Sequence, residues 1–197
     1  ALFEVMEERQ VSMDGVTYPM GELYTILATQ NPVEQEGTYR LPEAQLDRFL
    51  MKVTMGYPSA DDELEILKRH EQHTDLVKLS DVKPVLTKEE VLQLRSYMND
   101  VVIDESLLRY ITQIVQQTRS SRAVYLGASP RASVAMLQAS KAYALLQGRD
   151  FVTPEDIKAV TPSILQHRLV LTAEAEMEGY TAYKVAMKLI DKVEVPK

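Results

Sequence analysis

The chain has 197 residues, of which 45% are hydrophobic and 26% charged, and its formal net charge is −7. These values are typical of a globular protein with one large or two small domains, and they argue against non-specific nucleic-acid binding, which needs a basic surface. The absence of cysteine excludes disulfides and thiolate metal sites, and no apolar run approaches the roughly 18 residues of a membrane span. No signal peptide is visible, so we expect a cytoplasmic protein.

The first 20 residues predict a helix followed by a β-hairpin. Apolar side chains recur at helical spacing over residues 1–9, and acidic residues, Glu7 among them, face outward. Asp14 and Gly15 stand between alternating apolar and polar residues, which is a strong signal for a tight two-residue turn. We therefore expect a hairpin at about 10–20.

A buried strand is predicted at residues 23–28, where apolar side chains form a short continuous run. Asn31 follows the end of this strand, and ligands of open α/β sheets bind beyond the carboxyl ends of strands. A polar loop then leads to a short helix that begins near Pro42, because proline is favoured at the first helical position. This helix carries Arg48, and a second strand is predicted at about 49–55.

The sequence after residue 58 predicts a small helical bundle. The residues at 56–59, Gly-Tyr-Pro-Ser, interrupt the pattern, so we place a domain boundary there. Successive helices begin at residues that stabilise helix N-termini, namely Asp61, Thr87, Asp104, Ser129 and Thr153. The expected inner faces are Leu107, Leu108, Ile111, Val115 and Thr118 on one helix, and Ala132, Ala135, Met136, Ala139, Tyr143 and Leu146 on the next. A last helical segment is expected at about 180–192.

Three motifs resemble the MoxR family of AAA+ ATPases. Residues 28–32 (ATQNP) are similar to the end of the family's sensor-1 strand, and residues 36–49 (EGTYRLPEAQLDRF) resemble its most recognisable signature. Residues 127–133 (GASPRAS) resemble the sensor-2 motif of the helical lid. Arg40 departs from the pattern, because the family usually has proline there.

The resemblance implies a partial α/β AAA+ core at residues 1–58, with a β-hairpin and parallel strands, and an all-α lid domain at residues 59–197. It covers only the second half of a MoxR ATPase. The sequence contains no Gly-x-x-x-x-Gly-Lys-Ser/Thr motif and no apolar strand ending in Asp-Glu, which would hold phosphates and magnesium. We therefore expect both Walker motifs to lie upstream of Ala1, and this chain alone to be inactive.

The resemblance also assigns three site residues: Asn31 as sensor 1, Arg48 as the arginine finger and Arg131 as sensor 2. An amide can donate a hydrogen bond to a γ-phosphate or orient water, and a guanidinium can make bidentate contacts with phosphate oxygens. A cation in the first turn of a helix opposes the helix dipole unless an anion is bound there, which favours an anion site at Arg131. A turn-forming asparagine and two solvated surface arginines remain the alternatives.

The function implied is ATP hydrolysis with Mg²⁺ in a homo-oligomeric ring, expected to be a hexamer. Such proteins act as chaperones that remodel partners, often von Willebrand factor A domain proteins, or help to insert metal cofactors. A non-catalytic helical interaction module is one alternative. A DNA-translocating relative of magnesium chelatases and MCM helicases is another, although the acidic charge argues against it. His70 and His73 have a spacing that permits metal binding, but a solvated helix end is the favoured interpretation.

Overall fold

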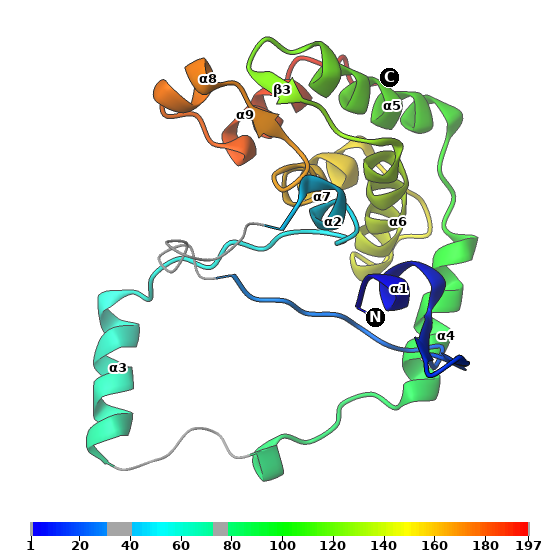
Figure 1. Cartoon of the computed structure of the whole chain (residues 1–197), viewed down its shortest axis with the longest axis vertical. Helices are drawn as coiled ribbons and strands as arrows, with labels where there is room; N and C mark the ends of the chain where they lie inside the picture. The colour runs from blue at the N-terminus through cyan, green and yellow to red at the C-terminus, as the bar shows by residue number, and fades with distance from the viewer. Residues whose placement is uncertain (1, 31–40, 73–78, 197) are drawn as a thin grey trace.

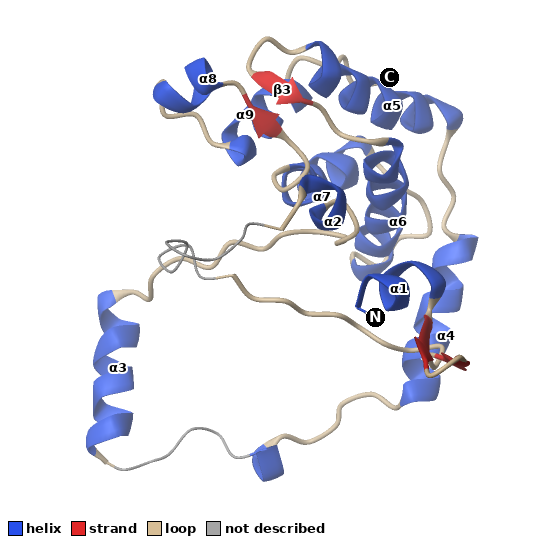
Figure 2. Cartoon of the chain, in the orientation of Figure 1, coloured by secondary structure: helices blue, strands red, loops and turns tan. Residues whose placement is uncertain are grey.

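The structure is a computed structural model, and it describes residues 2–30, 41–72 and 79–196. Helices dominate it, and the few strands are short (Figures 1 and 2). In chain order the elements are α1 (Leu2–Glu8), β1 (Gln10–Met13), β2 (Val16–Pro19), α2 (Glu43–Leu46), α3 (Ala60–Glu71), the 3-10 helix η2 (Leu79–Asp81), α4 (Lys88–Asp100), α5 (Glu105–Ser120), β3 (Val124–Leu126), α6 (Pro130–Leu146), α7 (Pro154–Leu165), β4 (Val170–Leu171), α8 (Ala173–Met177) and α9 (Ala182–Ile190).

The predicted hairpin is present. Strands β1 and β2 pair antiparallel, from Gln10 opposite Pro19 to Met13 opposite Val16. Both turn residues between them have positive φ, 52° at Asp14 and 76° at Gly15. A two-residue turn of this kind needs positive φ at both central positions, which explains why Asp-Gly is so strong a signal.

The two strands predicted at residues 23–28 and 49–55 are wrong, because both segments are coil in the structure. No strand of the described residues pairs with either segment, and a strand without a neighbour has nothing to satisfy its backbone groups. Leu27, expected to be buried, is 91% exposed. The second segment is instead joined to the end of α7, where the backbone N–H of Lys52 donates to the carbonyl oxygen of Ser163 at 2.9 Å.

The core lies among α5, α6, α7 and α9, with the small antiparallel pair β3–β4 at one side (Figure 1). Its buried side chains run from Val101 to Ile190. The capping residues expected for α4, α5 and α6 are all confirmed as N-caps that accept a backbone hydrogen bond. The strands β3 and β4 and the short helix α8 carry no periodic signal long enough to have been expected.

The predicted inner faces are correct in part. On α6, Ala132, Ala135, Met136 and Ala139 are buried as expected. Leu108, Tyr143 and Leu146 are 38%, 36% and 83% exposed, so their assignment to the core is wrong. On α5, Leu107, Ile111, Val115 and Thr118 are buried as expected, and the buried stripe also includes Tyr110 and Ile114. The last buried residue of α6 is Ala144.

Helix α3 lies apart from the bundle, contrary to the expectation that every helix after residue 58 would pack into it (Figure 1). It has a full capping box at Ser59, and every one of its side chains is exposed. Local capping therefore accounts for this helix without any tertiary packing. Among the described residues, no helix is long and apolar enough to cross a membrane.

Gly127 lies close against the backbone of Arg119 at the end of α5. A Cβ atom at this position would lie 2.8 Å from the Cα atom of Arg119, a distance that side-chain carbons do not adopt. Two hydrogen bonds join the two segments here. Arg119 Nε donates to the carbonyl oxygen of Ala128 at 2.9 Å, and Ala128 N–H donates to Thr118 Oγ1 at 3.0 Å. Glycine is therefore required just before the helix that carries Arg131.

We predict that Gly127→Ala destabilises the chain by about 1–3 kcal/mol, because two backbone segments must separate to admit the methyl group. In a chain of this size, that loss lowers the melting temperature by roughly 5 °C. The matched control is Gly56→Ala, since a Cβ there meets no described atom within 4 Å. Thermal unfolding followed by circular dichroism measures both variants, and equal melting temperatures would contradict the assignment.

Candidate functional site

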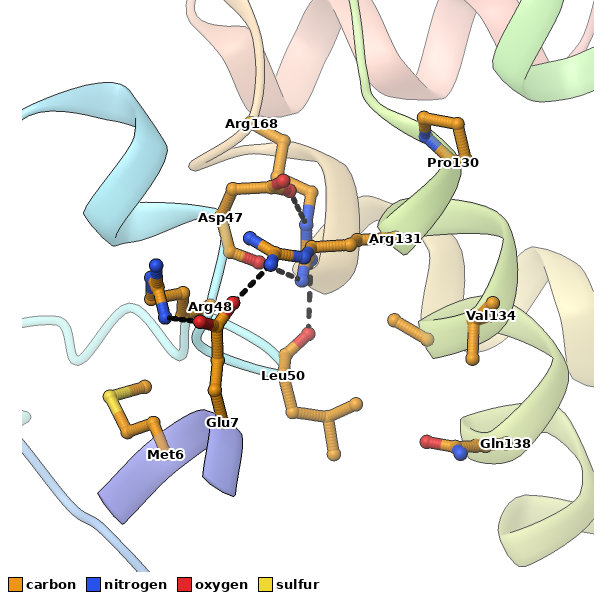
Figure 3. A pocket seen from close by; sticks show the side chains of 11 residues that line it. Met6, Glu7, Asp47, Arg48, Leu50, Pro130, Arg131, Val134, Gln138 and Arg168 are labelled. Carbon is orange, nitrogen blue, oxygen red and sulfur yellow. Dashed lines mark hydrogen bonds and ion pairs between the residues drawn. The ribbon is translucent and has the colours of Figure 1, made fainter. Parts of the chain in front are cut away.

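A cavity of about 550 Å³ lies between α1, the segment after α2 and the first turns of α6 (Figure 3). Its wall includes Arg48 and Arg131, two of the three residues singled out from the sequence. These arginines are far apart in the sequence, and the fold brings them to one place. Asn31 lies outside the described residues, as do residues 32–40.

Both arginines pair with the same carboxylate. Arg48 Nη1 bonds to Oε2 of Glu7, and Arg131 Nη2 bonds to Oε1 (Figure 3). The hydrogen bond from Arg48, together with the charges of both arginines, holds the pKa of Glu7 below its usual range. This corner of the cavity suits an anionic group, because two guanidinium groups converge here on one carboxylate.

The start of α6 adds to this preference. Ser129 is the N-cap, with its Oγ accepting from Arg131 N–H at 3.2 Å, and Pro130 takes the first helical position. Every residue in the first turn of α6 is described by the structure, and none of them is acidic. A helix N-terminus without its own acids favours an external anionic group, and here the carboxylate of Asp47 lies beside it, with Oδ2 accepting from Ser129 Oγ at 2.7 Å.

A third arginine, Arg168, also lines the cavity and is almost completely buried, with 3% of its side chain exposed. Its Nε donates to Oδ1 of Asp47 at 2.8 Å. The four remaining N–H groups donate to backbone carbonyl oxygens: those of Asp47 at 3.1 Å, Phe49 at 2.6 Å, Leu50 at 3.1 Å and Ile164 at 2.6 Å. All five donors of the guanidinium are therefore used, which is what a buried arginine requires.

Sequence reasoning missed three residues of this site: Glu7, Asp47 and Arg168. The sequence predicts Glu7 as an outward-facing charge of an amphipathic helix. That prediction is correct for the helix, but it does not show that two arginines contact this carboxylate. Arg168 carried only a weak signal, because it follows the polar residues Gln166 and His167 and precedes the apolar residues Leu169 to Leu171. A charged residue beside apolar positions is either exposed or paired, and this one is paired.

His167, the residue before Arg168, is held in its neutral form. Its Nε2 is 3.0 Å from the carbonyl oxygen of Phe49. Because a carbonyl only accepts, Nε2 carries the proton, and the buried Nδ1 finds no hydrogen-bond partner among the described residues. Burial, reinforced by the charge of Arg168, lowers the pKa of His167 to about 4.

We predict from His167 that stability falls as the pH falls from about 6.5 to about 4. Unfolded histidine titrates near 6.5 and the folded residue near 4, so unfolding takes up a proton in this window and acid favours the unfolded chain. After allowance for partial solvent exposure, the loss is on the order of 2 kcal/mol. Urea titrations at pH 7 and pH 4.5 measure it.

The control for this measurement is His70→Gln, which changes an exposed histidine on α3 and should leave the pH dependence as it is. His167→Gln keeps a donor for the Phe49 carbonyl but cannot titrate, so it should remove most of the loss. If His167→Gln and the unchanged chain lose equal stability between the two pH values, His167 is not the titrating group.

The fold and the site together define a class. An incomplete α/β segment with a β-hairpin is followed by a helical lid, and two arginines from the two parts meet at a helix N-terminus that favours an anion. This is the arrangement expected of the lid side of a nucleotide-phosphate site.

Comparisons with known proteins agree with this class. Residues 1–51 match the family described as ATPase family associated with various cellular activities (AAA), and residues 116–188 match the AAA lid domain. The chain is 46% identical over its whole length to YeaC of Bacillus subtilis, covering 60% of that protein. It is 39% identical over its whole length to the chaperone MoxR1 of Mycobacterium tuberculosis, covering 53%.

Among solved structures, the crystal structure of a candidate ATPase from Cytophaga hutchinsonii is 40% identical, with a TM-score of 0.88 over the whole chain and 61% of that structure. The chain therefore belongs to the MoxR family of AAA+ ATPases, and its fold is a partial AAA+ core followed by a helical lid. It spans between one half and two thirds of the length of the relatives that it matches. The roles of Asn31, Arg48 and Arg131 stay predictions.

Proposed function

We propose that this chain is the sensor and lid part of a ring-forming AAA+ ATPase that hydrolyses ATP to remodel client proteins. The observation that carries the proposal is the convergence of Arg48 and Arg131 on the single carboxylate of Glu7. Phosphate and Mg²⁺ are bound mainly by Walker residues outside this chain, so the chain alone binds ATP weakly and hydrolyses none. Asn31, as sensor 1, orients the attacking water.

Glu7 indicates how the two arginines act. Each oxygen of the Glu7 carboxylate accepts from one of the two guanidinium groups. A γ-phosphate can make the same kind of contact, and it offers three oxygens and more negative charge than a carboxylate. Both arginines therefore act on one phosphate group in our proposal. If Arg48 is a finger that reaches the site of the neighbouring subunit, Arg131 reaches that same site.

We further propose two units, a core part at residues 1–58 and a lid at residues 59–197. The main buried apolar cluster, which begins at Val101 and ends at Ile190, supports this division because it lies entirely within the second unit. We predict that residues 59–197 unfold cooperatively when expressed alone and that residues 1–58 do not, since their extended segments lack neighbouring strands. Circular dichroism melting of each piece tests this, and the reverse result would move the boundary.

The proposal extends to the assembly and its clients. The ring is a hexamer in the cytoplasm, and the clients are von Willebrand factor A domain proteins or proteins that receive a metal cofactor. The name of the mycobacterial relative, chaperone MoxR1, supports the remodelling role. A net charge of −7 disfavours the DNA-translocating alternative.

We predict that Arg48→Ala in the full-length protein lowers ATP turnover by on the order of 10³ while ATP binding stays nearly intact, because the finger acts mainly on the transition state. Arg48→Lys should rescue poorly, since lysine cannot make planar bidentate contacts. The matched control is Arg109→Ala, which removes an arginine that is 74% exposed and paired with Glu105 on its own helix. This chain without the Walker residues serves as the inactive reference.

Mixed rings distinguish whether each arginine acts on its own subunit's site or on its neighbour's. Arg48→Ala subunits should regain activity when mixed with subunits whose magnesium-binding Walker carboxylates are removed. At some interfaces the second kind of subunit then supplies an intact finger to the intact site of the first kind. Arg48→Ala mixed with Arg131→Ala should stay inactive if both arginines act from the same subunit on one neighbouring site. Recovery in this second mixture would separate the two roles, and no recovery in the first would refute the finger.

A further inference from the structure

The carboxylate of Asp47, the residue before Arg48, connects the two parts of the site. Its Oδ1 accepts from Arg168 Nε at 2.8 Å, and its Oδ2 accepts from Ser129 Oγ at 2.7 Å (Figure 3 shows the first contact). Ser129 is the N-cap of α6, directly before the turn that carries Arg131. One largely buried carboxylate therefore contacts both the base of the bundle and the start of α6.

Arg168 fixes the backbone on both sides of Arg48. It donates to the carbonyl oxygens of Asp47, before Arg48, and of Phe49 and Leu50, after it. It also donates to the carbonyl of Ile164 within α7, at 2.6 Å. The peptide groups around Arg48 are thereby attached to a helix of the core, although the segment from residue 47 to residue 52 is outside any helix or strand.

We propose that Asp47 and Arg168 are positioning residues of the phosphate site. They set the separation between Arg48 and Arg131, so that both guanidinium groups meet one anion without rearrangement. The inference rests on the proposed function, in which these two arginines contact phosphate. Geometry of this kind matters because a displacement of about 1 Å in a positioned group can cost on the order of 10²-fold in rate.

A purely structural role is the competing explanation, and the chain contains a matched control for it. Arg149 and Asp156 form a second ion pair in the same bundle, at 2.5 Å, with 28% of the Arg149 side chain and 2% of the Asp156 side chain exposed. Asp156 also accepts from the backbone N–H of Thr153 at the start of α7. Both pairs therefore join an arginine to a helix N-terminus, but the Arg149 pair does not line the cavity.

The first test uses this chain and does not depend on ATP hydrolysis. Asp47→Asn keeps the size and one acceptor oxygen while removing the charge. It should increase the picosecond-to-nanosecond motion of the Arg48 and Arg131 side chains, measured as lower Nε–H order parameters by NMR relaxation. Asp156→Asn should leave both values unchanged. Order parameters that stay the same in Asp47→Asn, or fall equally in both variants, would overturn the inference.

The second test uses the full-length protein. Asp47→Asn should lower kcat at least tenfold, whereas Asp156→Asn should lower the melting temperature and leave kcat unchanged. In a background lacking both Arg48 and Arg131, Asp47→Asn should change the residual turnover less than twofold, because it acts only through them. An equal effect in both backgrounds, or an unchanged kcat in Asp47→Asn, would overturn the positioning role.

A further variant covers the case in which Asp47→Asn fails to fold. Arg168→Lys keeps the buried positive charge but loses the five-donor fork, so it should lower kcat with the same dependence on Arg48 and Arg131. Failures of the two proposals are distinguishable. If Arg48→Ala and Arg131→Ala leave turnover unchanged, the proposed function fails and this inference with it; if they lower turnover and neither Asp47→Asn nor Arg168→Lys does, only this inference fails.

Discussion

The guanidinium group of Arg168 is the contact on which the arrangement of this chain depends. Burying a charged group is costly unless each of its polar atoms is paired, and the five N–H groups of Arg168 meet five acceptors. Four of these acceptors belong to residues 47–50 and one to α7. The segment that carries Arg48 has no sheet to pair with among the described residues, and these hydrogen bonds supply its attachment to the lid.

The consequence for the site is a separation of charges into two layers. At the inner wall of the cavity, Arg168 is balanced by Asp47, and only 3% of the Arg168 side chain is exposed. Nearer the solvent, Arg48 and Arg131 both contact the carboxylate of Glu7. The buried pair is neutral, whereas the two outer arginines converge on one anionic group. Electrostatic preorganisation of this kind lets a site bind a charged group with little reorganisation.

Local features were predictable from the sequence, and long-range ones were not. The turn at Asp14-Gly15 and the N-cap at Ser129 depend on residues within a few positions, so pattern alone identified them. The two failed strands had the right composition, but a strand forms only where a neighbour pairs with it, and composition does not show the neighbour. Arg48 and Arg131 were identified through motif resemblance. Their convergence on Glu7 required the fold, because Glu7 precedes Arg131 by 124 positions.

The position of Glu7 is itself fixed by the hairpin. Glu7 lies in the last turn of α1, and the chain enters β1 at Gln10. Ser12 Oγ of the hairpin donates to Glu4 on α1 at 2.5 Å, and Met20 N–H closes the unit by donating to the carbonyl of Arg9 at 2.7 Å. Helix α1 and the hairpin therefore form one local unit. The carboxylate that stands between the two arginines is delivered by this unit, while the arginines themselves are placed from the opposite side by Arg168 and α6. The site is thus the junction of two separately held parts, and its charge balance depends on how those parts meet.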